Sequence, residues 1–171
     1  MMLSRTWIAR LPLNVIYEVA LDNEVPWTLL AAIVQTESGG DTMAARFEPD
    51  YKYLLKSAEF AKLNAITPMT EMMFQKTSWG LCQVMGGVAR EHGHTGSLLE
   101  LLIPEINLRI GCKHIKKFMQ KYQNKDDLIA AYNAGTPVKG LDGKYRNQLY
   151  VDKVNSYLNA LNETFEYAKK G

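Results

Sequence analysis

The chain has 171 residues, of which 47% are hydrophobic and 22% are charged. These fractions are typical of a globular domain with one hydrophobic core, so they exclude a disordered or collagen-like chain and favour a single domain over residues 1–171. The 20 Lys and Arg residues barely outnumber the 18 Asp and Glu residues, which is too small an excess for a protein that neutralises many phosphates. We expect a monomer that does not bind nucleic acid.

The N-terminal stretch is the candidate for a membrane span or a signal peptide. Arg10 and Glu18 interrupt it, and no run of about 18 apolar residues occurs. The sequence therefore predicts no stable membrane insertion and no signal peptide, and we expect a protein that is made in the cytoplasm. Cys82 and Cys112 lack CxxC spacing, and their apolar or helical surroundings favour buried free thiols over a disulfide.

Two helices are predicted near the start of the chain. Apolar residues recur at helical spacing over Pro12–Asn23, which indicates an amphipathic helix. Pro26 then opens a stretch that is apolar on every side and is followed by Gly39 and Gly40. This second pattern predicts a fully buried helix that ends near Ser38.

The middle of the chain has a looser pattern. Residues 41–77 contain many aromatic residues and two prolines, and we expect them to form an arm over the core, with one helix around Tyr51–Leu63. Leu81–His92 is expected to be helical, because Gly80 precedes it and Gly93 follows it as breakers.

Three further helices are predicted in the last third of the chain. Pro104–Tyr122 has the clearest amphipathic pattern, Asp126–Ala134 is short and apolar, and Tyr150–Phe165 repeats apolar residues at helical spacing. Lys139–Tyr145 can form a small β-hairpin, and no other alternating strand of convincing length occurs. The fold class is therefore mainly α. The outward face of the amphipathic helix is expected to be solvated and carries Lys113, Lys116, Lys117 and Lys121.

Glu37 is the residue that does not fit the core pattern, because it places a carboxyl group in the last turn of an apolar helix. Apolar neighbours and the negative end of the helix dipole both disfavour ionisation, and no Lys or Arg lies three or four residues away. The local sequence therefore predicts a raised pKa. A protonated carboxyl is what general-acid cleavage of a glycosidic bond requires. The alternative is a solvated side chain beyond the helix end, beside Ser38.

Several motifs follow Glu37 in a characteristic order. They are Glu37-Ser38, Ser78–Met85 (SWGLCQVM), Asn107 with Gly111, Ala131–Gly135 (AYNAG), and Tyr150-Val151 with Val154. In this order they resemble the soluble lytic transglycosylase domain, which has a lysozyme-like fold that shares its core with goose-type lysozymes. The resemblance covers Leu13–Leu158.

The resemblance implies roles for individual residues. Glu37 matches the catalytic acid/base, and Gln83 and Met85 match the groove segment that holds an N-acetyl group and packs on a sugar face. Tyr132 matches the residue expected to hydrogen-bond the catalytic carboxyl, and Tyr150 matches the aromatic that closes the site. The other positions expected to bind or orient substrate are Ser38, Ser78, Gly80, Leu81 and Asn133.

The chain also departs from the family pattern. Cys82 stands where the family usually has Met, and Gly86 stands where it often has Pro, which indicates a divergent member. The stretch between Ser38 and Ser78 is longer than in compact members. Together with the small size and the missing signal peptide, this arm is similar to that of phage-encoded lysis proteins.

Glu48 is a second candidate carboxylate, because it lies in the arm that we expect near the groove. It can position water or a sugar hydroxyl, or it can form an ion pair with Arg46, which an extended chain places on the same face. A second carboxylate facing Glu37 would favour a hydrolase, whereas a lone acid/base favours a transglycosylase.

Other chemistries have weaker support. His92 and His94, with Glu91, invite a zinc site, but no local spacing specifies a third ligand and His114 is the remaining histidine. No phosphate loop or GxSxG nucleophile motif is present. We therefore expect no metal and no cofactor. Of the tryptophans, Trp27 is expected in the core, and Trp79, next to Gly80, in the groove.

The leading hypothesis is a lytic transglycosylase that acts on peptidoglycan glycan strands. It would cleave the β-1,4 bond between N-acetylmuramic acid and N-acetylglucosamine and leave 1,6-anhydro ends, in the bacterial cell wall after release or delivery. The first alternative is a muramidase with the same acid and water as acceptor. The second is a wall-binding or virion structural protein without turnover.

Overall fold

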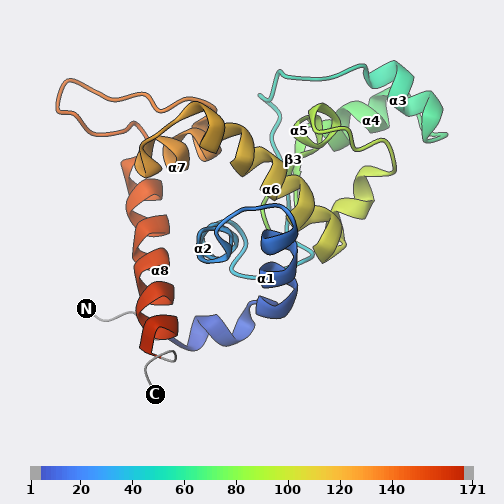
Figure 1. Ribbon diagram of the computed structural model, residues 1–171. Helices are drawn as coiled ribbons and strands as arrows, with labels where there is room; N and C mark the ends of the chain where they lie inside the picture. Colours follow the sequence, from blue (N-terminus) through green and yellow to red (C-terminus); the bar gives the residue numbers. More distant parts are fainter. Residues whose placement is uncertain (1–4, 168–171) are drawn as a thin grey trace.

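The computed structural model describes residues 5–167, which form a mainly helical fold with a small antiparallel sheet (Figure 1). The chain starts with a 3-10 helix, η1 (Arg5–Arg10), and a second one, η2 (Leu98–Leu102), precedes α6. The α-helices are α1 (Leu13–Asp22), α2 (Trp27–Glu37), α3 (Ser57–Leu63), α4 (Pro68–Gln75), α5 (Gly86–Glu91), α6 (Pro104–Lys121), α7 (Lys125–Ala134) and α8 (Gln148–Tyr167). The strands are β1 (Ala45–Phe47), β2 (Thr77–Trp79) and β3 (Val84–Met85).

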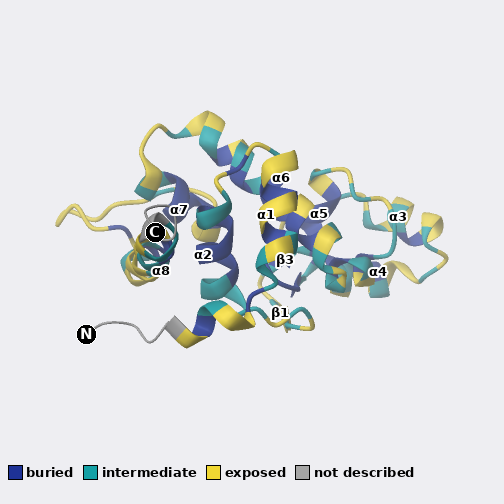
Figure 2. Cartoon of the chain, turned by 60° about the horizontal axis from the view of Figure 1, so that its bottom comes forward, coloured by how far each residue is buried: buried dark blue, intermediate teal, exposed yellow. Residues whose placement is uncertain are grey.

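Helix α2 is the centre of the core. Its residues 29–34 are all buried, as the uniformly apolar pattern predicts. Helices α1, α6, α7 and α8 surround it, each packed against the next, and α2 itself packs against α1 and most extensively against α8 (Figures 1 and 2). The end of α2 is therefore held in place by helices from both halves of the chain.

The helices predicted outside the arm are confirmed to within a few residues, apart from the one expected over Leu81–His92. That segment contains a turn and strand β3 before α5 begins at Gly86. The predicted Lys139–Tyr145 hairpin is present as one isolated antiparallel bridge between those two residues. Cys82 and Cys112 are both buried and free, as expected. Among the helices within residues 5–167, none is long and apolar enough to cross a membrane.

The sheet was not predicted, and the arm contains more structure than expected. Strands β1, β2 and β3 pair antiparallel in that order, and each is too short to produce a visible alternation. The arm has two helices, α3 and α4, and the first begins at Ser57 rather than at Tyr51. Thr67 caps α4 by accepting a hydrogen bond from the backbone amide of Thr70, and Pro68 occupies its first turn. Figure 2 shows α3 and α4 at the end of the molecule away from α8.

A buried ion pair attaches this arm to the core. Arg90 of α5 donates hydrogen bonds to both carboxylate oxygens of Glu71 in α4, at 2.8 and 2.9 Å, and both side chains are fully buried. Arg90 also donates to the carbonyl oxygens of His94 and Gly96 and lies 4.3 Å from the ring centroid of Phe60 in α3. The guanidinium group therefore joins α4 of the arm to α5 and to the loop that follows α5.

The close approach of the arm also requires a glycine at position 86. A Cβ atom at Gly86 would lie 2.3 Å from the carbonyl oxygen of Phe74 and 2.8 Å from the Cα atom of Gln75. Any side chain at this position would collide with the backbone of α4. The arm and the glycine at position 86 therefore depend on each other.

The Arg90–Glu71 pair leads to a stability prediction. Replacing Arg90 by Met would leave the Glu71 carboxylate buried without its cation, which is expected to lower the free energy of unfolding by about 3–5 kcal/mol. Lys116→Met is the matched control, because Lys116 pairs with Glu24 at the surface, and its loss should cost less than about 1 kcal/mol. Urea unfolding of both variants measures the difference, and equal costs would contradict the role given to Arg90.

Candidate active site

A cavity of about 780 Å³ lies at the carboxyl end of α2, between the sheet and arm on one side and α6 and α7 on the other. We call it the Glu37 cavity. Its wall includes most of the side chains that the sequence motifs single out, namely Glu37, Glu48, Ser78, Gln83, Met85, Tyr132 and Asn133. The motifs are far apart in sequence, so the fold brings them together as predicted.

Glu37 is the last residue of α2 and is partly buried at the cavity wall. The hydroxyl group of Tyr150, from the first turns of α8, donates a 2.6 Å hydrogen bond to Glu37 Oε1. Because α2 and α8 pack together along the core, this hydrogen bond is fixed by the packing of the two helices. The carboxyl group has one defined orientation as a result.

Burial raises the pKa of the Glu37 carboxyl above its ordinary value, as the sequence predicted. The Tyr150 hydrogen bond and the positive charges of Arg46 and Lys153 lower this pKa, and burial outweighs them. No Lys or Arg lies three or four residues from Glu37 in the sequence, but the fold brings Arg46 from β1 and Lys153 from α8 close enough to lower its pKa. Lys153 also donates a hydrogen bond to the Thr36 carbonyl at the end of α2.

Tyr132 has a different partner from the one that the family resemblance implied. Its hydroxyl group is buried and donates a 2.9 Å hydrogen bond to the carbonyl oxygen of Cys82, not to Glu37. Tyr150 makes the bond to the carboxyl instead. Tyr132 therefore supports the 80–83 turn, and its ring contributes to the wall of the cavity.

Three of the expected site residues build the frame beside Glu37 and do not line the cavity. Gly80 has φ +64°, and a Cβ atom there would lie 2.5 Å from the Leu101 carbonyl oxygen and 2.6 Å from Asn107 Nδ2. Leu81 is completely buried, and its carbonyl oxygen accepts a 2.9 Å hydrogen bond from the hydroxyl of Ser38. The tight turn is thus tied directly to the residue after Glu37.

Asn107 of α6 also holds this turn in place. Its side chain accepts a hydrogen bond from the Cys82 amide and donates to the carbonyl oxygens of Trp79 and Leu101.

Trp79 itself is buried, and its indole N–H donates to the Phe74 carbonyl. The expectation that Trp79 faces the groove was wrong, because its strand position points it into the core. Trp27 is packed edge-on against Phe165, in agreement with its expected core role.

One face of the sheet forms a wall of the cavity. Arg46 is paired with Ser78 and Ser78 with Met85 across the three strands, so these side chains share a face, and all three line the cavity. The amide of Gln83 is bound to the protein, because its oxygen accepts from Ser78 and its nitrogen donates to the carbonyl oxygens of Ala44 and Gly80. These hydrogen bonds stabilise Gln83 at a φ of +47°, in the left-handed region. Its side-chain nitrogen donates to backbone carbonyl oxygens of the protein itself.

Glu48 and Arg46 form the ion pair that the sequence offered as one of two possibilities. Both side chains line the Glu37 cavity, so Glu48 is also near the groove. Asn133 is exposed at the wall, where its side-chain oxygen accepts a hydrogen bond from Asn147. The structure thus confirms the ion pair and leaves the second carboxylate in the same cavity as Glu37.

Sequence reasoning missed several wall residues. Among them are Tyr51, Tyr53, Glu91, His114 and Thr136. Lys117 and Lys121, which we expected on a solvated helix face, also line the cavity. Their assignment requires knowing which side of the arm and of α6 faces Glu37, and a single sequence carries no signal for that.

The histidines that suggested a metal site have other partners. His92 Nε2 lies 3.1 Å from His114 Nδ1, and burial lowers the pKa of His92 to about 4 and that of His114 to about 3. His94 is next to the Ser97 carbonyl oxygen and Glu100. Within the described part of the chain, no group of three or more His, Cys, Asp and Glu side chains is arranged to hold a metal ion.

The helices around α2, with the cavity at its carboxyl end, define a protein of the lysozyme-like class. The family model described as "Transglycosylase SLT domain" matches residues 14–154. The chain therefore belongs to the transglycosylase SLT domain family, whose domain is a lytic transglycosylase that acts on peptidoglycan. This agrees with the resemblance seen over Leu13–Leu158. A search of the curated proteins found no match.

The raised pKa of Glu37 predicts how Glu37→Gln changes stability with pH. A carboxyl whose folded-state pKa is raised stabilises the folded protein fully below its unfolded pKa, and this contribution is lost as pH rises through the folded value. The Gln side chain does not titrate. The melting temperature of the variant relative to the parent should therefore increase as the pH rises from about 4 to about 8. A difference that is constant or decreases over this range would contradict the raised pKa.

Proposed function

We propose that this protein cleaves the β-1,4 bond between N-acetylmuramic acid and N-acetylglucosamine in peptidoglycan and that Glu37 acts as both acid and base. The observation that carries the proposal is the environment of Glu37. Its carboxyl group is oriented by Tyr150, has a raised pKa because of burial, and borders a cavity with room for sugar rings. A carboxyl whose pKa is raised keeps its proton to higher pH than an ordinary carboxyl, which suits the general acid of such a reaction.

The proposed reaction needs one proton-transferring group. Glu37 donates its proton to the glycosidic oxygen as the bond to C1 of the muramic acid breaks, and the substrate's own N-acetyl group stabilises the positive charge at C1. The ionised carboxylate then accepts the proton of the C6 hydroxyl group of the same sugar. The C6 oxygen closes on C1 to form the 1,6-anhydro ring, and Glu37 is protonated again without consumption of water.

Other residues are proposed to support this chemistry without transferring protons. Tyr150 keeps Glu37 Oε1 in one position. Ser78 and Met85 present a polar and an apolar surface on the sheet face of the cavity, and Asn133 offers polar groups on the other side. Four further residues are proposed to act indirectly, because they hold the backbone of the turn beside Glu37 in place. They are Ser38, Gly80, Leu81 and Gln83.

The hydrolytic alternative rests on Glu48. It lines the same cavity as Glu37, and a second carboxylate is what a hydrolase uses to activate water. Its carboxylate forms an ion pair with the Arg46 guanidinium, which favours a role in shaping the sheet wall. We therefore place Glu48 among the substrate-orienting residues rather than among the proton-transferring ones.

We further propose that the reaction serves lysis of a bacterial host by a phage. The support is the resemblance of the chain, including its arm over residues 41–77, to phage-encoded lysis proteins. In this proposal the protein is made in the cytoplasm and reaches the cell wall by release or delivery. A wall-binding or virion protein with the same fold is the alternative that an absence of turnover would favour.

Mass spectrometry of digested peptidoglycan tests the proposed reaction. Purified protein is expected to release muropeptides with 1,6-anhydro ends, and Glu37→Gln should reduce their rate of formation by about 100-fold to 10,000-fold. Glu48→Gln is the informative comparison, because it should retain anhydro products at a substantial rate. Products that carry an added water, or a loss of activity in Glu48→Gln equal to that in Glu37→Gln, would instead support a muramidase.

A further inference from the structure

The arm contributes two tyrosines to the wall of the Glu37 cavity. Tyr51 and Tyr53 lie in the irregular segment before α3, and their rings meet edge to face with centroids 5.7 Å apart. Tyr51 is half-buried, whereas Tyr53 is 74% exposed. Most of the Tyr53 side chain is therefore accessible to a molecule that enters the cavity.

The tyrosines rest directly on α5. A Cβ atom at Gly87 would lie 2.6 Å from the Tyr53 carbonyl oxygen and 2.9 Å from both the ring and the hydroxyl oxygen of Tyr51. The absence of a side chain at position 87 therefore allows the arm segment to pack against the helix backbone. The two adjacent glycines contact different parts of the arm. Gly86 allows the backbone of α4 to approach α5, and Gly87 allows the approach of the segment that contains Tyr51 and Tyr53, which we call the tyrosine segment.

A chain of buried hydrogen bonds holds the other end of the tyrosine segment. Gln75 pairs with the backbone of Leu55 in both directions, accepting from its amide at 2.7 Å and donating to its carbonyl oxygen at 2.8 Å. The same Gln75 nitrogen donates to Glu71, which is bound by Arg90. The segment has no regular secondary structure, yet it is fixed to α4 and α5 by completely buried side chains.

These observations describe an exposed aromatic surface on a preorganised support. We propose that Tyr53, supported by Tyr51, is a stacking platform for a saccharide ring of the glycan strand, at the arm side of the Glu37 cavity. The inference rests on the proposed function, because the ligand is the same glycan strand that Glu37 cleaves. Tyr53 is a binding residue in this proposal and takes no part in bond cleavage.

The chemistry of the wall favours a sugar ring as the occupant. The face of an aromatic ring carries negative electrostatic potential and attracts the weakly positive C–H groups on the flat face of a β-linked pyranose. Arg46, Glu48 and Glu91 line the same cavity and offer charged partners to hydroxyl and acetamido groups. A fixed aromatic face surrounded by a few polar groups is the usual composition of a small-ligand site, and its rigidity lowers the entropy cost of binding.

The test measures binding without turnover. Both the parent and the variants carry Glu37→Gln, and the ligand is peptidoglycan glycan strands from which the stem peptides have been removed, titrated by isothermal calorimetry. Tyr53→Ala is expected to weaken binding about tenfold, and Tyr53→Phe should stay within about twofold of the parent, because it keeps the aromatic face. Since Tyr53 is highly exposed, the melting temperature should be unchanged in both.

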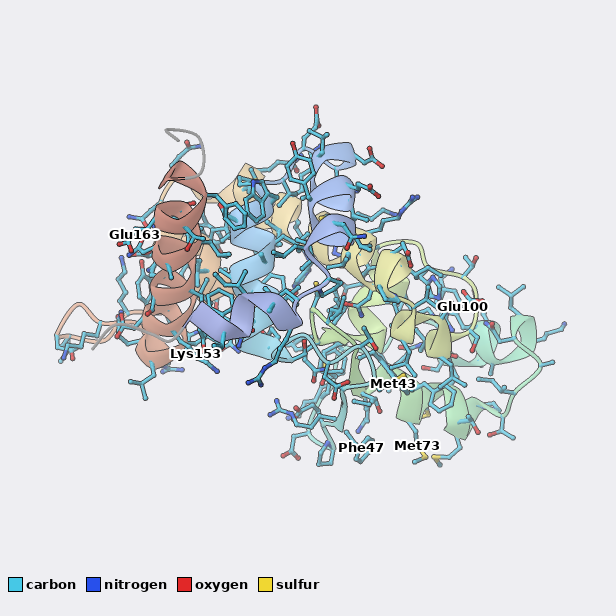
Figure 3. All side chains as sticks on the ribbon, turned by 90° about the horizontal axis from the view of Figure 1, so that it is seen from below. Met43, Phe47, Met73, Glu100, Lys153 and Glu163 are labelled. Atoms are coloured by element: carbon cyan, nitrogen blue, oxygen red, sulfur yellow. The ribbon has the colours of Figure 1, made fainter. Side chains whose placement is uncertain are left out.

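Phe47→Ala is the matched control. Phe47 is also an exposed aromatic residue of the arm, but it does not line the cavity, and Figure 3 shows it at the outer edge of the structure. Its removal should leave the affinity unchanged. The platform is contradicted if Tyr53→Ala binds like the parent, or if weakening is seen with peptide-bearing strands alone, which would assign Tyr53 to the stem peptide. A parent that binds no glycan strand at all would overturn the proposed function together with the platform.

Discussion

The site depends on one hydrogen bond that joins the two most extensively packed helices of the core. Tyr150 of α8 donates to the Glu37 carboxyl at the end of α2. Because α2 is apolar on every side, it can be surrounded by other helices, and this burial both raises the pKa of Glu37 and brings Tyr150 within reach. The packing of the hydrophobic core and the chemistry of the carboxyl group therefore have the same origin.

The opposite wall of the cavity is built by a different mechanism. The arm has few buried apolar residues of its own, and it is attached by polar groups that are fully buried, above all Arg90, Glu71 and Gln75. Gly86 and Gly87 let the arm approach α5 closely. The arm that is held in this way contributes Tyr51 and Tyr53 to one side of the cavity.

The sequence predicted the helices and the central carboxyl well, because both depend on local patterns. The uniform apolar stretch before Glu37 predicted a buried helix and a raised pKa from adjacent residues alone. The three strands were not predicted, because two or three residues are too few to show the alternation of apolar and polar residues that indicates a strand. The hydrogen-bond partners of Tyr132 and Tyr150 also could not be assigned, since they depend on the rotation of α7 and α8 about their axes and not on spacing. Tyr53 and Lys117 were not recognised as cavity residues, because a single sequence does not show which side of the arm segment or of α6 faces Glu37.

The central claim concerns the proton on Glu37, and a carbon-13 NMR titration of its side-chain carboxyl measures it directly. Comparison with Glu37→Gln assigns the resonance. We expect a pKa above the ordinary value of 4.5 in the parent, and a further increase in Tyr150→Phe, because the hydrogen bond that lowers the pKa is removed. A pKa at or below 4.5 in the parent, or a decrease on loss of the Tyr150 hydroxyl, would contradict the account.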